Sequence, residues 1–561
     1  MNYKNIILII FILIFYQTPM HSKSSSFDNF DSKNFSKYFS GIVAFENKDN
    51  SKALNFFDSS KILTSKHEPY LKRYVYSLIL DNRFNRAVSI IKNNKNKDNT
   101  NFFDAYLILT LNYLKKNNLD MATQNLNSVP ENILDDKFNL AILETLKQYI
   151  YVFKEKKILD AKKNLGRLSI ISETFQRCYL GDINTETYFS ELINDSEANY
   201  SRYIFFYLSY LIENNRVDDA KKIVNNYDYI NLTLLLSQGK SWIENENLEK
   251  LLSVFSCKNY NDVISEFLFL ISNLYSSEND FKKSNFYLNL SNFMNPKFVF
   301  NLSLVAENQY SNKEYDKALK TLKNFKKEDS FYHWYRVKKE SQIISKQKNK
   351  TKSLNHMVLE FNKISKPNNK ILFDVANFYK NSKKYDEAIK FYTKLIMTLN
   401  HDSEISSDLL YRRGGTYERL GEYEKADKDL LDALKADPDD AYILNYLAYS
   451  WLERNIKIYD AIEMLKKAYK LESDDPYIID SIGWAYYLIN DYQKAEKFLK
   501  RAVELMPDDP IVNDHYGDIL WMLDRKIQAR YFWKNVIKME NTEEEMIEKI
   551  NLKIIQGLKS S

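Results

Sequence analysis

Residues 476–510, PYIIDSIGWAYYLINDYQKAEKFLKRAVELMPDDP, carry the pattern that decides the fold. The apolar positions of the first half fall at i, i+3, i+4 and i+7, the spacing of one α-helix face: Ile479, Ile482, Gly483 and Tyr486. Asn490-Asp491 interrupts the period. The helical period then resumes through Tyr492, Ala495, Leu499 and Ala502 and ends at Pro507. The stretch predicts a hairpin of two short helices.

Small residues mark the point where the two helices cross, because a side chain larger than a methyl group would force the axes apart. With Pro476 numbered as place 1, Gly483 stands at place 8 and Ala495 at place 20. Both places recur at spacings of 34 or 35 residues. The small residues that define the repeats are Gly414, Ala426, Ala448, Ala461, Gly483, Ala495, Ala502, Gly517 and Ala529. Four consecutive units in register leave little room for chance.

This period and these places resemble the tetratricopeptide repeat. The resemblance implies an all-α, right-handed superhelical solenoid of antiparallel hairpins, with about 12–14 units in a chain of this length. Place 20 can be followed upstream with falling regularity through Ala388, Ser353, Ala318, Ser284, Ala220, Ala161, Ala122, Ala87 and Ala53. We therefore expect the amino-terminal units to be degenerate.

The register also suggests a division of the chain. We expect a signal peptide or anchor at 1–22, a Ser-rich spacer at 23–33, degenerate repeats at 34–170 and 201–368, an irregular joint at 171–200, clear repeats at 369–541 and a capping helix at 542–561. The joint is the place where the count slips, and it favours two arms of solenoid. A continuous superhelix with one irregular joint is the alternative.

The amino terminus differs from the rest of the chain. An unbroken run of 11 apolar residues, Ile6 to Tyr16, follows Lys4. This length fits the core of a secretory signal, about 7–15 residues, better than a membrane span of about 20. We expect export to the periplasm or cell envelope, with an uncleaved anchor as the alternative. No Cys follows the run, so lipid attachment at that point is excluded.

Two cysteines remain, Cys178 and Cys257, 79 residues apart in different repeats. Two thiols make no disulfide framework, although an exported chain could join them. Because free Cys is often buried, the sequence favours two buried thiols.

Composition and motifs indicate no catalytic function. Formal charge is only +5, which gives no case for nucleic acid. The six histidines show no metal-ligand spacing, and we find no phosphate loop or nucleophile elbow. His515, at place 6, is the best catalytic candidate, but it has no positioned partner in sequence and packing is favoured. We expect no catalytic residue, no metal and no cofactor.

Places 4, 7, 8 and 11 serve the core, so places 2, 5, 9 and 12 should project toward the concave groove. They hold aromatic and acidic residues, including Tyr442, Tyr477 and Ile511 at place 2. The predicted partner-binding residues are Tyr411, Asn445, Tyr449, Asp480, Trp484, Tyr487, Asp514, Asp518 and Trp521. Such a set suits a segment carrying Lys or Arg. The alternative is that Trp484 and Trp521 pack against an adjacent repeat or the terminal cap.

The last repeats resemble those of exported bacterial tetratricopeptide proteins. The motifs are Asn445-Tyr-Leu-Ala-Tyr-Ser-Trp451, Asp480-Ser-Ile-Gly-Trp-Ala-Tyr486 and Asn513-Asp-His-Tyr-Gly-Asp518, followed by Leu520-Trp521, Ala529 and Trp533. Some members of that group are lipoprotein adaptors that bind a carboxy-terminal processing protease. This chain departs from them because it lacks the lipid-attachment Cys. It also differs from carboxylate-clamp domains, whose basic groove places are acidic here.

The resemblance thus implies a non-enzymatic envelope adaptor whose partners are other proteins or peptides, with a protease or assembly machinery among the candidates. Membrane association could occur through the amino-terminal segment, and no nucleic acid is expected. Two alternatives stay open. The array could be a structural spacer with partners on its convex face, or an accessory subunit of a separate enzyme.

Overall fold

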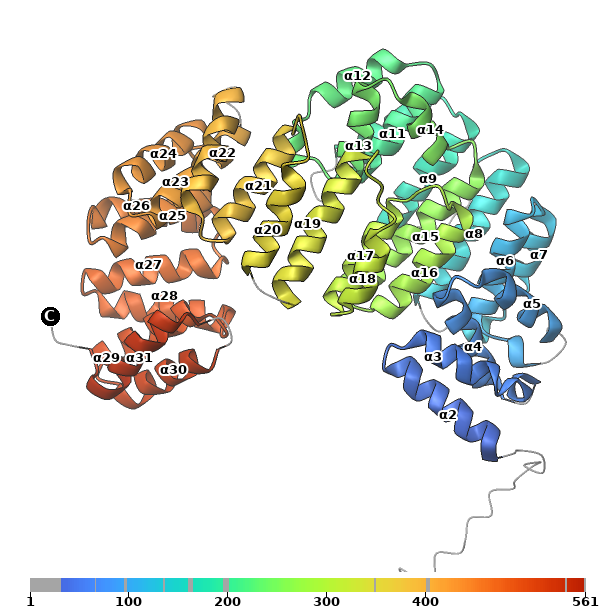
Figure 1. Ribbon diagram of the computed structural model, residues 1–561, viewed down its shortest axis with the longest axis horizontal. Helices are drawn as coiled ribbons and strands as arrows, with labels where there is room; N and C mark the ends of the chain where they lie inside the picture. The colour runs from blue at the N-terminus through green and yellow to red at the C-terminus, as the bar shows by residue number, and fades with distance from the viewer. Residues whose placement is uncertain are drawn as a thin grey trace, which may run out of the picture. The chain divides into compact units, whose positions relative to one another are not determined.

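The computed structural model describes residues 32–65, 67–94, 98–134, 137–159, 165–194, 201–347, 350–399, 404–539 and 542–558. Within these ranges the regular structure is entirely helical, which confirms the predicted all-α solenoid of helical hairpins (Figure 1). None of the helices described is both long and apolar enough to cross a membrane. The predicted signal or anchor, and the spacer up to residue 31, lie outside the described residues.

The chain divides into two compact units. Unit 1 contains the described residues of Met1–Asn226 and Thr233–Arg336, and unit 2 those of Tyr227–Leu232 and Val337–Ser561. The division falls inside helix α19 (Ser330–Gln347) and not at residues 171–200, where the sequence favours a break between two arms.

The α-helices of unit 1 are α2 (Ser32–Glu46), α3 (Asn50–Asp58), α4 (Glu68–Leu80), α5 (Phe84–Asn94), α6 (Phe103–Lys115), α7 (Leu119–Asn127), α8 (Lys137–Glu155), α9 (Arg167–Leu180), α10 (Thr185–Ile193), α11 (Ser201–Glu213), α12 (Val217–Asn225), α13 (Leu234–Glu244), α14 (Leu248–Val254), α15 (Tyr260–Ser277), α16 (Phe281–Met294), α17 (Asn301–Ser311) and α18 (Tyr315–Leu322). Short 3-10 helices η1 (Lys61–Ser65), η2 (Asp98–Thr100) and η3 (Glu131–Ile133) connect some of them.

Unit 2 contains η4 (Tyr229–Asn231), α20 (Lys350–Phe361), α21 (Asn369–Asn381), α22 (Tyr385–Thr398), α23 (Glu404–Arg419), α24 (Tyr423–Ala436), α25 (Ala441–Glu453), α26 (Ile458–Leu471), α27 (Pro476–Leu488), α28 (Tyr492–Leu505), α29 (Pro510–Met522), α30 (Lys526–Lys538) and α31 (Glu544–Gln556). The pairs from α21–α22 to α29–α30 are hairpins, and α31 packs against α30 after the last of them.

The hairpin quoted from the sequence forms with the expected ends. The Asp475 carboxylate accepts hydrogen bonds from the backbone N–H groups of Tyr477 and Ile478 and so caps α27, while Pro476 occupies the first turn, where no N–H is needed. Asn490 has φ 63°, a left-handed conformation that turns the chain into α28. Asp440 and Asp509 cap α25 and α29 in the same way.

The small residues lie where the helices cross. A Cβ atom added to Gly483 would lie 2.7 Å from Leu499 Cγ, and one added to Gly517 would lie 2.5 Å from Nε1 of Trp533. Place 8 therefore meets place 24 of the same hairpin. Place 20 is fully buried in the described units: Ala53, Ala87, Ala122, Ala220, Ser284, Ala318, Ser353, Ala388, Ala426, Ala461, Ala495 and Ala529. Ala161 lies outside the described residues.

The predicted irregular joint is corrected, because α9 and α10 form a helical pair over its described part. Phe175 of α9 and Phe189 of α10 are fully buried and their rings meet at 6.2 Å. Bulky aromatic residues fill this pair, so a search for a small residue at place 20 could not find it.

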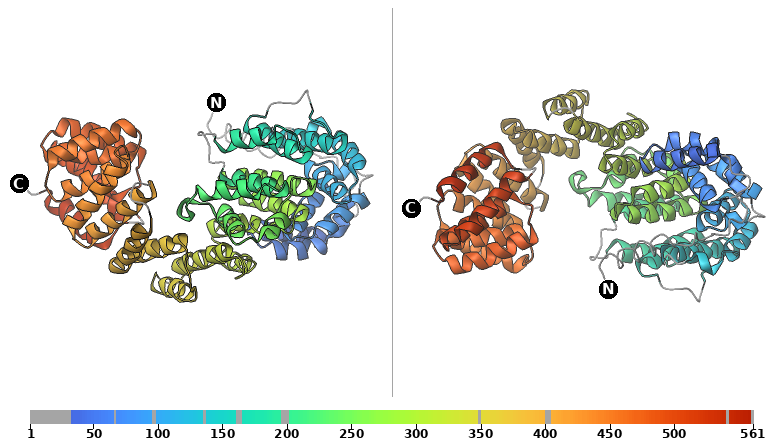
Figure 2. Two further views of the ribbon diagram at one scale, coloured as in Figure 1. Left: turned by 90° about the horizontal axis from the view of Figure 1, so that it is seen from above. Right: turned by 90° about the horizontal axis from the view of Figure 1, so that it is seen from below.

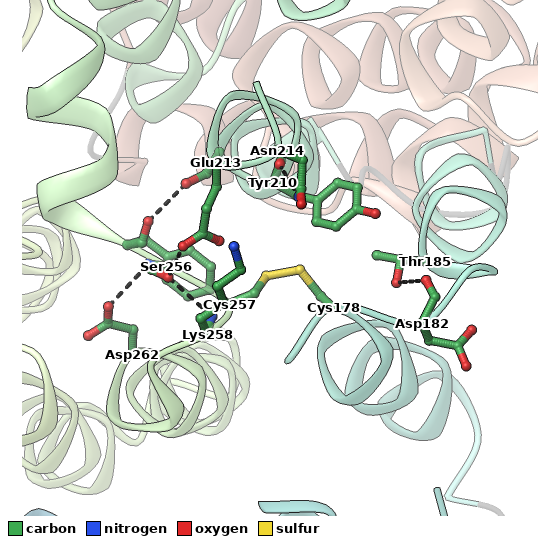
Figure 3. Close-up of a disulfide and its surroundings, with 12 residues drawn as sticks. Cys178, Asp182, Thr185, Tyr210, Glu213, Asn214, Ser256, Cys257, Lys258 and Asp262 are labelled. Atoms are coloured by element: carbon green, nitrogen blue, oxygen red, sulfur yellow. Dashed lines mark hydrogen bonds between the residues drawn. A yellow bond between two sulfur atoms is a disulfide. The ribbon is translucent and has the colours of Figure 1, made fainter. Parts of the chain in front are cut away.

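The expected free thiols are also corrected. Cys178 and Cys257 are buried, as predicted, but they are joined by a disulfide (Figure 3). Their Cα atoms lie 5.6 Å apart because the last turn of α9 lies beside the loop between α14 and α15. That loop is held by Ser256, whose hydroxyl donates to Glu213 at 2.6 Å and whose N–H donates to Asp262 at 3.1 Å.

Candidate functional site: the first-helix wall of unit 2

The first helices of successive hairpins form a wall in each unit, and in unit 1 that wall is covered by the chain itself. Helices α15 and α16 lie against α4, α6, α8 and α9, inside the arc that these helices describe (Figure 2). The phenol of Tyr260 on α15 donates to the carbonyl of Leu114 on α6 at 3.0 Å, and the Lys115 ammonium donates to the carbonyl of Met294 on α16 at 2.6 Å.

Aromatic rings fill the same contact. Tyr76 of α4 stacks on Phe286 of α16 with centroids 4.4 Å apart. On the other side of the hairpin, Phe153 of α8 stacks on Tyr260 of α15 at 5.2 Å. Because α15 and α16 occupy this surface, the wall of unit 1 offers little room for a partner.

The wall of unit 2 consists of α21, α23, α25, α27 and α29, and it carries all the predicted partner-binding residues. Its most exposed large apolar side chains are Tyr442, Tyr477 and Ile511, which are 55%, 51% and 48% exposed. They stand at place 2 of α25, α27 and α29. We call these three residues the rungs. Their exposure agrees with the predicted direction of place 2.

A polar and aromatic cluster lies deeper in the wall, between α27 and α29. His515 Nδ1 lies 2.8 Å from Asp480 Oδ2, and both side chains are buried. The half-buried Trp484 ring stacks on His515 at 4.1 Å and on Tyr487 at 4.6 Å. His515 therefore has the positioned partner that sequence reasoning did not find.

The electrostatics of this cluster follow from burial and from three carboxylates. Burial opposes a charge on His515, but Asp480, with Asp514 and Asp518 nearby, raises the pKa of the imidazole above its ordinary value. Burial, together with the charge of Asp514, raises the pKa of Asp518 to about 7, against the opposing effect of Lys553.

The helix α31 covers the end of the wall. Its Lys553 ammonium donates to Asp514 at 2.7 and 2.9 Å and to both oxygens of Asp518 at 2.8 Å. Asp518 also accepts the indole N–H of Trp533 at 3.0 Å. A Cβ added to Gly557 would lie 1.9 Å from the ring of Trp521, so the backbone at Gly557 lies directly on that indole.

The remaining predicted residues lie on α23 and α25 and are half-buried. Tyr411 meets Tyr446 edge to face at 5.5 Å, and burial raises the pKa of Tyr411. Tyr449 lies 6.3 Å from the His515 ring, and burial raises its pKa as well. Asn445 has an Oδ1 atom without a hydrogen-bond partner in the described part of the chain.

The structure corrects the predicted exposure of Asp480 and Asp518, which are buried, while partner binding by the half-buried residues of this set stays a prediction. Asp480, Asp514 and Asp518 bind neighbouring first helices or α31, and Trp484 and Trp521 pack against the next repeat and the end of the chain. The alternative kept open for the two tryptophans is therefore the one the structure shows. Lys553 was missed as a partner because it lies on α31, 39 positions after Asp514, and a repeat register does not reveal such a contact. The hydrogen bond from Trp533 to Asp518 joins the two helices of one hairpin, and it was missed because place numbers do not show which side chain stands opposite.

The wall carries exposed apolar side chains and buried carboxylates. Among the residues the structure describes, no group of three His, Cys, Asp or Glu side chains could hold a metal ion. The wall instead combines exposed apolar side chains with acceptor oxygens. It belongs to a repeat protein in which stacked helical hairpins present one surface.

The sequence profile of the family described as Tetratricopeptide repeat matches residues 365–541. A TPR repeat-containing protein of Pseudomonas aeruginosa is 36% identical over 91 residues, which are 16% of this chain and 15% of that protein. The match thus spans well under two thirds of that relative's length.

Part of the chain is also similar to two solved tetratricopeptide repeat structures. A tetratricopeptide repeat protein from Parabacteroides merdae gives a TM-score of 0.38 at 16% identity, covering 45% of this chain and 98% of that one. A thermophilic TPR protein of Thermus thermophilus gives a TM-score of 0.30 at 17% identity, covering 33% of this chain and 99% of that one.

Residues 365–541 therefore match tetratricopeptide repeats, as the sequence period predicts for this part of the chain. Proteins with these repeats commonly bind other proteins.

Proposed function

We propose that this protein is a non-enzymatic adaptor of the cell envelope, which is exported by its amino-terminal apolar run and holds a partner protein on the wall of unit 2. The partner would be a protease or an envelope-assembly factor. One observation carries the proposal: the wall of unit 1 is covered by its own α15 and α16, whereas the wall of unit 2 exposes the rungs Tyr442, Tyr477 and Ile511. Exposed aromatic side chains are typical of binding surfaces.

Two features support the envelope address. The run from Ile6 to Tyr16 has the length of a signal core. The disulfide between Cys178 and Cys257 is of a kind that persists in oxidising compartments such as the periplasm. The address is tested by fusing a reporter that is active only outside the cytoplasm after Ser40. We expect activity, and a fusion that stays in the cytoplasm would contradict the envelope role.

Partner binding is tested by site-specific cross-linking of the full chain in an envelope fraction. A photoreactive residue replaces Tyr477 or Glu453 on the first-helix side. Matched probes replace Tyr459 and Glu463, which are exposed on the second helix α26. We expect adducts from the first pair. Adducts from the α26 pair alone would favour the structural spacer with partners on its convex face, and adducts from neither would contradict an adaptor.

A further inference from the structure

The rungs form a regular row. Tyr442, Tyr477 and Ile511 share place 2 on α25, α27 and α29, and these first helices pack as neighbours. Because packed helices lie about 8–10 Å apart, successive rungs repeat at roughly that distance. An apolar row of fixed period remains exposed along this edge of unit 2.

Two acceptor atoms lie one helical turn from the rungs. Asn445 follows Tyr442 by three residues, and Asp480 follows Tyr477 by three, so each pair shares a helix face. Asp480 is only 4% exposed, and His515 takes its Oδ2 while its Oδ1 has no hydrogen-bond partner in the described ranges. The Oδ1 of Asn445 is also buried without a partner there. A buried acceptor without a donor costs free energy, and a donor from a ligand can reach either atom only when the side chains around it move aside.

Helix α29 shows which kind of donor binds a carboxylate at place 5. Asp514 stands at place 5 of α29, the same place as Asp480 on α27. Its carboxylate binds the ammonium of Lys553, which reaches it from α31 at 2.7 and 2.9 Å. A lysine from an adjacent segment therefore satisfies a place-5 carboxylate within this chain.

The edge next to the rungs is acidic. The turns before α25, α27 and α29 carry Asp437, Asp439, Asp440, Glu472, Asp474, Asp475, Asp508 and Asp509. Lys467 pairs with Asp439 at 2.8 Å, and Arg501 lies 3.9 Å from Asp474. The carboxylates outnumber these cations, so the edge attracts a basic segment and repels an acidic one.

We propose that the rungs dock an extended, basic segment of the partner protein in the polyproline II conformation. Every third residue of the segment is apolar and lies on a rung, and a Lys or Arg side chain between them donates to Asp480 Oδ1. A polyproline II chain advances about 9.3 Å in its three-residue turn, which matches the rung spacing. A β-strand would turn every third side chain to the opposite face. This inference rests on the proposed function and specifies its ligand.

The test uses the full chain and a labelled synthetic peptide of five Pro-Ala-Lys repeats, followed by fluorescence anisotropy. One control peptide has the same composition with irregular proline spacing, and a second has Glu in place of Lys. We expect saturable binding that weakens at least about fivefold with irregular spacing and is lost with Glu, and that weakens as salt rises. Failure to saturate below about 1 mM would overturn the proposal.

Variants then locate the site. Tyr477→Ser should weaken binding at least about tenfold, as expected for a central anchor. Tyr459→Ser, which removes a 76% exposed tyrosine from α26, should change it less than about twofold. Asp480→Asn should weaken binding most at low salt, with circular dichroism confirming an unchanged helix content.

Equal effects of the two tyrosine variants would overturn the site. If the wall cross-links in the envelope fraction persist while the peptide does not bind, the adaptor function stands and only this ligand class fails. If the probes on the wall give no cross-links, both the adaptor function and the proposed ligand class are contradicted.

Discussion

His515 Nδ1 lies 2.8 Å from Oδ2 of Asp480, and the pair is buried between two consecutive repeats of unit 2. Since the partners come from α27 and α29, their interaction joins one repeat to the next. Burial opposes the charge on His515, but the carboxylates of Asp480, Asp514 and Asp518 raise its pKa above the ordinary value. A titratable group thus links the stability of the array to pH.

We predict that the free energy of unfolding falls as pH rises from about 6 to 8. The unfolded imidazole has a pKa near 6.5, and the folded value is higher. The stabilisation is therefore fully present below about pH 6.5 and is lost as pH rises through the folded pKa. His515→Gln should flatten this fall in urea unfolding followed by circular dichroism. An identical pH profile in both proteins would contradict the prediction.

Asp518 should also make the free energy of unfolding fall as pH rises, but over a lower pH range than His515. Its folded pKa of about 7 lies above that of an unfolded aspartate, so the folded state holds a proton that the unfolded state has lost. This adds a decline between about pH 4 and 7, and His515→Gln should leave most of it in place.

The second prediction concerns Lys553, whose ammonium binds both Asp514 and Asp518. Lys553→Met should destabilise the end of unit 2 by roughly 1–3 kcal/mol, because it leaves the buried Asp518 carboxylate with only the indole N–H of Trp533 as a donor among the described residues. Lys549→Met is the matched control on α31, since Lys549 is mainly exposed and pairs with Glu545 within one turn. It should cost less than about 0.5 kcal/mol. Equal losses by denaturant unfolding would show that the ion pairs do not hold α31.

The features that sequence predicted well depend on contacts within one hairpin. Place 8 and place 20 are only about a dozen residues apart, so the crossing of Gly483 over Leu499 and the burial of Ala495 follow from local periodicity. The features it missed depend on distant partners. Cys178 meets Cys257 across 79 residues, and Lys553 meets Asp514 across 39. Place numbers give the direction of a side chain but not what stands opposite it.

In the candidate site, too, place numbers predicted the direction of each side chain but not its neighbours, so the prediction held at some places and failed at others. Place 2 was predicted to be exposed and is exposed at Tyr442, Tyr477 and Ile511. Places 5 and 9 were predicted to face an open groove, but Asp480 and Asp518 are buried against the following first helix or its substitute α31. The same first helices therefore carry exposed residues at place 2 and buried residues at places 5 and 9. Only the packing of neighbouring helices decides which of them is exposed.

The third prediction concerns the disulfide. Cys178→Ser with Cys257→Ser should lower the stability of unit 1 by about 2–5 kcal/mol, the range for removing a native cross-link. Thermal unfolding of the wild type with a reductant should show the same loss, and the double variant should not respond to the reductant. A wild type whose melting is unchanged by reduction would contradict a structural disulfide.

The fourth prediction tests the helix crossing. Ala495→Leu should destabilise unit 2 by roughly 1–3 kcal/mol, because a fully buried methyl has no room to grow. Lys494→Leu makes the neighbouring change on a side chain that is mainly exposed, and it should cost less than about 0.5 kcal/mol. Similar urea-unfolding losses for the two variants would mean that place 20 is not the crossing point.

The fifth prediction compares Trp484, which packs between two repeats, with the exposed Tyr477. Trp484→Ala removes the ring that stacks on His515 and Tyr487, and it should cost roughly 2 kcal/mol or more. Tyr477→Ala, about two turns away on the same helix face, removes an exposed ring and should change stability by less than about 0.5 kcal/mol. Binding of the partner should show the reverse order, with Tyr477→Ala weakening it while helix content stays intact. If Trp484→Ala instead kept full stability and lost only binding, Trp484 would face the partner directly and its assignment to the packing between repeats would be wrong.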